Sequence, residues 1–164
     1  MVESVIVILV LVIVVAVGYN AIEDYHKKDK YKISFKESMD LTELPVITFV
    51  NNNVKLNFLL DTGSNSCYIN ESVLNSYNLE YKSSNSETPM IGVEGNRVFV
   101  KNCQMTISYK DLHFDSVFNI NNMDAAFENI KKESGVQIHG ILGSLFFQKY
   151  KYVLDFDSLI AYLK

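Results

Sequence analysis

One short run of residues has the types and the order needed for acid–base chemistry. The apolar residues 58–60 are followed by a carboxylate, a hydroxyl, a glycine and a second hydroxyl, which are Asp61, Thr62, Gly63 and Ser64. An unbroken apolar run is typical of a buried strand, so we expect Asp61 to lie where a strand leaves the core. A carboxylate held among hydroxyl and amide donors can act as a general acid or base. The competing interpretation is a plain turn, because Asp, Gly and Ser are common turn residues.

The surrounding pattern predicts the strands that position this run. Residues 45–60 form a predicted hairpin around the turn 51–53, because Asn tolerates left-handed backbone. Further along, the predicted elements are a strand at 67–69, a short helix capped by Asn70, a glycine-bearing hairpin at 89–98, strands at 98–108 and 113–120, a helix at 144–150 capped by Ser144, and two closing strands at 152–156 and 159–163.

Two polar stretches are predicted to be mostly irregular. Residues 81–88 are Ser-rich and predict a loop. Residues 121–137 predict a long polar segment with one helical turn near 124–131, which either covers a cleft or binds something. We expect the rest of the chain from residue 44 onward to form one domain.

Composition excludes several classes of function. The chain has 164 residues, 48% of them apolar, and a net charge of −4, so nothing favours nucleic-acid binding. The three histidines lack the spacing of a helical zinc site, and no metal site is predicted. Cys67 and Cys103 are the two cysteines, and two alternatives remain open for them, one disulfide or two buried free thiols.

The N-terminal segment 1–22 predicts a membrane anchor. Residues 5–22 are almost wholly apolar, long enough to cross a bilayer core of about 30 Å. A cleaved secretory signal is the alternative, although no basic residue precedes the run. Lysines follow it, which weakly favours a cytoplasmic domain. Residues 23–43 are then a predicted tether, unless 31–35 form a first edge strand.

Taken together, the chain resembles the retropepsin-like family of aspartic proteases. Three features carry the resemblance: the hairpin that runs into Asp61-Thr62-Gly63-Ser64, the glycine-bearing hairpin about thirty residues later, and the late run Gly140-Ile141-Leu142-Gly143 followed by a helix. The family implies a mostly β fold over residues 44–164. It is a closed, barrel-like acid-protease half-fold with one or two short helices, here preceded by the N-terminal transmembrane helix.

The resemblance also implies roles for individual residues. Asp61 would be catalytic, Thr62 would bond across to a partner loop, Gly63 would donate its N–H to the carboxylate, and Ser64 would bond its outer oxygen. The flap would contain Ile91, Gly92, Val93, Glu94 and Gly95. The second hydrophobic-glycine element would be Ile141, Leu142 and Gly143. This chemistry requires neither a cofactor nor a metal.

A single Asp-Thr-Gly implies half of an active site. The Asp155-Phe156-Asp157 run lacks the glycine, so we expect a homodimer that pairs two copies of Asp61 and cuts a peptide or protein substrate. His139 and Ser144 depart from many relatives, which bears on dimer contacts and flap support. The alternative function is a catalytically silent module that binds extended peptides by strand addition.

Overall fold

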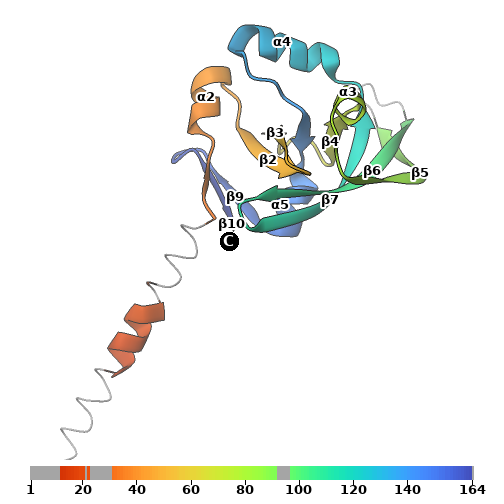
Figure 1. Ribbon diagram of the computed structural model, residues 1–164. Coiled ribbons are helices and arrows are strands. Elements are labelled where there is room, and N and C mark those ends of the chain that lie inside the picture. Colours follow the sequence, from red (N-terminus) through yellow and green to blue (C-terminus); the bar gives the residue numbers. More distant parts are fainter. Residues whose placement is uncertain (1–11, 21, 23–30, 92–96, 164) are drawn as a thin grey trace, which may run out of the picture.

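Six strands close into a barrel in the computed structural model, which describes residues 12–20, 22, 31–91 and 97–163 (Figure 1). Their order around the barrel is β2-β3-β8-β4-β7-β6, and β6 returns to β2 through the pair Val50 and Ser108. Their bounds are Val46–Asn51 for β2, Val54–Leu60 for β3, Cys67–Asn70 for β4, Arg97–Tyr109 for β6, Leu112–Asn121 for β7 and Gly140–Leu142 for β8. The predicted mostly β, closed barrel-like fold is therefore confirmed.

The first hairpin forms as the sequence predicts. Strands β2 and β3 pair antiparallel, from Val46 opposite Leu59 to Asn51 opposite Val54. Asn52 and Asn53 make the turn with φ values of 46° and 64°. Both lie in the left-handed region that Asn tolerates, so the turn residues set the register that places Asp61 at the end of β3.

The polar stretch that follows α3 (Glu71–Ser76) is a strand, and its prediction as a loop is wrong. Strand β5 runs from Tyr81 to Ile91 and pairs antiparallel with β6 along the outside of the barrel. Its register shifts between Ser84 and Thr88, which marks a bulge. The strand has no apolar alternation at its start because it is an edge strand, held by backbone pairing with β6 and not by a buried face.

Residues 33–42 belong to the folded domain. Strand β1, Ile33–Ser34, pairs with β10, Ile160–Leu163, and β10 pairs with β9, Tyr152–Asp155. Helix α2 follows at Lys36–Thr42, and Ile33 and Phe35 are buried in the main core. The structure thus corrects the predicted tether at 33–42 and agrees with the alternative of an edge strand at 31–35.

Helices are more extensive than the one or two short ones predicted. In the described part of the chain the domain holds α2 and α3, together with α4 (Asp124–Ser134) and α5 (Ser144–Tyr150). Helix α4 is three turns long because Phe127 and Ile130 pack onto a small apolar cluster with Val46 and Ile138. That packing, on the outside of the barrel, extends the single turn expected there (Figure 1).

The N-terminal apolar segment lies partly outside the described residues. Residues 12–20 are helical with exposed side chains, while residues 5–11 and 21 of the predicted span 5–22 are not described. Within the described residues, no helix has the length and apolar character needed to cross a membrane.

Candidate active site

Asp61 stands at the end of β3, half-buried at the mouth of a tight loop. Its backbone N–H donates to the carbonyl of Leu142 at 3.0 Å, which ties the loop to β8. Its side-chain Oδ1 accepts a hydrogen bond of 2.9 Å from the backbone N–H of Gly63, as the resemblance implies. One carboxylate oxygen is thereby oriented by a fixed backbone donor.

The loop that follows β8 crosses the Asp61 loop at Gly143. Strands β3 and β8 run parallel, with Leu60 opposite Leu142. Just beyond β8, the N–H groups of Ser144 and Leu145 donate to the carbonyls of Ser64 and Asn65, at 2.7 and 3.1 Å. These backbone bonds fasten the Asp61 loop to the start of α5.

Close approach of the two backbones requires a glycine at this crossing. A Cβ on Gly143 would lie 2.3 Å from the carbonyl oxygen of Ser66 and 2.7 Å from that of Ser64. Both are backbone atoms and cannot rotate away. The predicted hydrophobic-glycine element of Ile141, Leu142 and Gly143 thus lies directly beside the predicted Asp61 loop.

Two residues of the site make different bonds from those predicted. The hydroxyl of Ser64 donates to the carbonyl of Ser66 at 3.0 Å, within its own loop, and not to the carboxylate of Asp61. Ser144 does not cap α5, because Gly143 occupies the N-cap position without a side-chain bond. Thr62 is exposed. Its predicted bond to a partner loop stays a prediction.

The strand pair at the base of the predicted flap is observed. Strands β5 and β6 pair up to Ile91 opposite Arg97 and Met90 opposite Val98, so the base of the hairpin is formed. Gly92, Val93, Glu94 and Gly95 at its tip lie outside the described residues. The Phe99 side chain on β6 is 63% exposed.

Both cysteines are buried free thiols, which decides between the two alternatives left open by the sequence. Cys67 opens β4 just after the Asp61 loop, and burial raises its pKa. Burial also raises the pKa of Cys103, to about 11. A thiol with a raised pKa is a poor nucleophile, so both residues act as core packing.

His139 contributes to the interior of one protomer. It is 7% exposed, its Nδ1 accepts the backbone N–H of Asn57 at 2.9 Å, and its ring packs edge-on against Tyr77 with centroids 5.7 Å apart. Burial lowers its pKa. In the sequence this residue stands out only as a departure from relatives, and nothing there indicates a buried hydrogen-bond acceptor.

Asn70 has a further role that the sequence did not suggest. It occupies the N-cap position of α3 but makes no cap bond. Its amide group instead donates to Asp124 at 2.7 Å and accepts the backbone N–H of Met123 at 3.0 Å. The polar segment 121–137 is therefore fastened at the end of β4 away from the Asp61 loop.

Nothing in the described ranges is arranged to bind a metal. No group of three or more His, Cys, Asp or Glu side chains comes together there in a way that could hold an ion.

Comparison with known proteins identifies the pattern. A family model described as "Aspartyl protease" matches residues 47–146, more than half of the chain. Among solved structures, the chain is similar to EIAV protease complexed with an inhibitor. Their sequence identity is 22% and the TM-score 0.45, over 67% of this chain and 90% of that one. No curated protein matches.

Proposed function

Because this chain belongs to the retropepsin-like aspartyl protease family, we propose that it is an aspartic endopeptidase that works as a homodimer. Each chain contributes one Asp61, and the two carboxylates meet at the two-fold axis. The substrate is an extended peptide or protein segment bound beneath the hairpin of β5 and β6.

The chemistry follows from two carboxylates that share one proton. They cannot both ionise cheaply at such close range, so one stays protonated while the other is charged. The charged Asp61 takes a proton from a bound water as the water oxygen attacks the peptide carbonyl carbon, and the protonated Asp61 donates to the carbonyl oxygen. The tetrahedral intermediate then collapses: the C–N bond breaks, the leaving amine takes a proton from the dyad, and a hydroxyl of the intermediate gives a proton back to the dyad as the product carboxyl group forms.

The observation that carries this proposal is the state of the Asp61 carboxylate. Oδ1 is oriented by the Gly63 N–H, and among the described residues no donor or cation bonds Oδ2. A half-buried carboxylate at a strand end, with one oxygen fixed and the other unused within its own chain, fits one half of a shared site. Gly63, Leu142 and Gly143 support it through backbone contacts alone.

We also propose that the protein is attached to a membrane. The apolar run 5–22 would anchor the protein, and the lysines after it favour a domain on the cytoplasmic side. Two chains confined to one membrane have a raised effective concentration, which would promote dimer formation. Crosslinking in membranes that captured only monomers, while proteolysis persisted, would contradict this arrangement.

Cleavage of a mixed peptide library by the full chain, assayed across about pH 4 to 7, tests the activity, because the reaction requires a dyad that holds a single proton. Asp61→Asn should abolish every cut. The control is Asp157→Asn, an exposed carboxylate in the turn between β9 and β10, which should leave the cuts unchanged. If a folded dimer binds peptides but never cuts them, the protein is a peptide-binding module and not a protease.

A further inference from the structure

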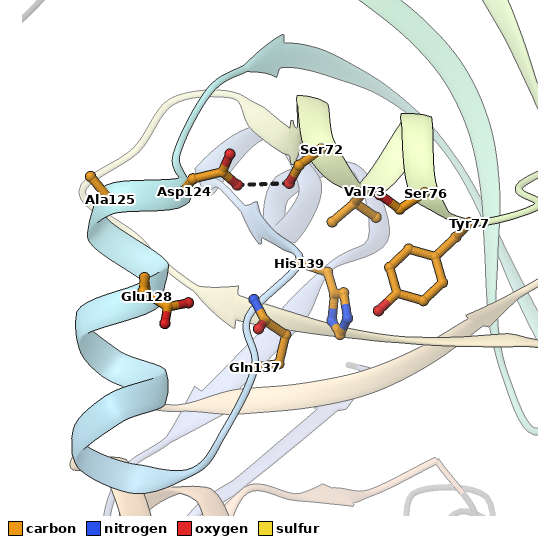
Figure 2. Close-up of a pocket in the computed structure, with 9 residues that line it drawn as sticks. All are labelled: Ser72, Val73, Ser76, Tyr77, Asp124, Ala125, Glu128, Gln137 and His139. Carbon is orange, nitrogen blue, oxygen red and sulfur yellow. Dashed lines mark hydrogen bonds between the residues drawn. The ribbon is translucent and has the colours of Figure 1, made fainter.

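A pocket lies between helices α3 and α4, apart from the Asp61 loop. It has a volume of about 440 Å³, and it is lined by Ser72, Val73, Ser76, Tyr77, Asp124, Ala125, Glu128, Gln137 and His139 (Figure 2). Ser72 and Ser76 lie one turn apart on α3, while Asp124 and Glu128 lie one turn apart on α4. Two polar helix faces therefore oppose each other across the space.

The pocket is a wedge that closes at one end and opens at the other. At the closed end the hydroxyl of Ser72 and the amide of Asn70 both donate to Oδ1 of Asp124 at 2.7 Å. These bonds lower the pKa of Asp124 and keep it charged. The wedge widens from there toward Ser76 and Glu128.

The lining carries negative charge without a matching cation. Asp124 and Glu128 are the charged residues among those that line the pocket, and no Lys or Arg is among them. Asp124 is partly engaged by its two neutral donors. Glu128 makes no hydrogen bond or ion pair within the described part of the chain, so its carboxylate is available to a ligand.

The ring of His139 presents a hydrogen-bond donor at the floor of the wedge. Nδ1 of His139 accepts the Asn57 N–H, so the proton of the neutral ring lies on Nε2. Within the described residues no acceptor bonds Nε2, and this atom is not among the buried polar atoms that lack a partner, so it is accessible from the pocket although the residue as a whole is only 7% exposed. The ring projects into the pocket beside Tyr77 (Figure 2). An accessible N–H that faces a pocket in this way can donate to an acceptor on a bound ligand.

We propose that this wedge is a second peptide-recognition site that takes a Lys or Arg side chain. The cationic head meets Glu128 and Asp124, the peptide's own carbonyl accepts the His139 Nε2–H, and the aliphatic stem lies against Val73 and Ala125. Long basic side chains bury their stems along apolar surface in this way. The open end of the wedge leaves room for the peptide to continue.

The site is separate from the proteolytic centre and does not depend on the proposed activity. Asn57, which bonds His139, lies four residues before Asp61 on β3, which corresponds to about 13 Å of extended strand. A variant of the wedge can therefore be compared with wild type while the Asp61 loop is left intact.

Histidine-selective ¹⁵N NMR of the full chain provides the test, because the chain has only three histidines. The probe is Nα-acetylarginine amide, and its neutral match is Nα-acetylcitrulline amide. We expect the arginine probe to shift the Nε2–H signal of His139, with no shift at His113, and the citrulline probe to leave both unchanged. Spermidine, a cation without a carbonyl, should bind more weakly and leave the His139 signal in place.

Two matched variants test whether the Glu128 carboxylate binds the cationic probe. Glu128→Gln removes a carboxylate that lines the wedge and should weaken arginine-probe binding by roughly tenfold or more. Glu133→Gln, an exposed glutamate on the same helix that does not line the pocket, should have no effect. Equal shifts with the citrulline probe, equal binding of spermidine, an unchanged affinity in Glu128→Gln, or no shift at all would each overturn the proposal.

Discussion

The backbone N–H of Asn57 donates a hydrogen bond of 2.9 Å to Nδ1 of the His139 ring. This bond joins β3 to the residue just before β8, and it requires an unprotonated Nδ1. Burial lowers the pKa of His139 from its ordinary value of 6.5. A proton on Nδ1 would leave two N–H groups facing each other in a buried place, so the bond makes the fold sensitive to acid.

Acid should therefore destabilise the folded state through His139. The folded pKa lies below the unfolded one, so as pH falls below about 6.5 the unfolded state takes up a proton first. The stabilisation present above that pH is lost as pH falls toward the lowered pKa. Urea unfolding at about pH 7.5 and pH 5.5 should show a fall in unfolding free energy for wild type. His139→Asn keeps an acceptor that does not titrate and should show a smaller fall, whereas an equal fall would contradict this account.

Gly143→Ala should disrupt the crossing of the two loops. The new Cβ would lie 2.3 Å from the Ser66 carbonyl oxygen, and relief requires a shift of the backbone that carries Asp61. We expect a loss of at least about 2 kcal/mol of unfolding free energy. Ser144→Ala, one residue later, keeps the backbone bond to Ser64 and serves as the control. A Gly143→Ala protein as stable as this control would show that the crossing tolerates a side chain.

Phe35 should contribute to stability as a core residue. It is 1% exposed and packs edge-on against Phe156, with ring centroids 5.5 Å apart. Phe35→Ala should cost about 3–5 kcal/mol in urea unfolding. The neighbouring Lys36 is exposed, and Lys36→Ala should change little. If both substitutions change the unfolding free energy equally, residues 33–35 act as a tether and not as part of the core.

Asn70→Ala should loosen α4 from β4. Asn70 is 1% exposed, and its loss leaves the Met123 N–H without its acceptor and removes one donor from Asp124. Unsatisfied buried groups of this kind cost about 1–3 kcal/mol. Ser72→Ala removes the other donor to Asp124 at a partly exposed position and should cost less. Hydrogen exchange of the α4 amides should be faster in Asn70→Ala than in Ser72→Ala. Equal protection in both variants would show that Asn70 does not hold α4 against β4.

Local sequence was enough to predict the parts of the fold that local chemistry determines. The Asn52-Asn53 turn, the apolar run into Asp61 and the run into Gly143 each carry residue types that favour one backbone conformation. Their order along the chain therefore predicted the hairpin and the two loops of the candidate site. The Gly63 bond to Asp61 was predicted from the family resemblance.

Other features depend on partners distant in sequence. Strand β1 exists because Ile33 pairs with Ala161, and the start of β5 because Ser83 pairs with Cys103. Residues 31–35 do alternate apolar and polar side chains, which is why an edge strand was the alternative there, whereas the start of β5 has no periodicity that indicates a strand. The tautomer of His139 depends on the register of β3 against β8, so the sequence could not show that its Nε2–H faces the wedge.

Mixing wild-type and Asp61→Asn chains tests whether two chains share one active site. At a fixed total concentration, equal amounts that exchange subunits freely leave about one quarter of the dimers with two Asp61 carboxylates. If the site is shared, we expect peptide cleavage at about one quarter of the all-wild-type rate, and none from Asp61→Asn alone. A rate of about one half would mean that each chain cuts by itself, which would contradict a site shared between two chains.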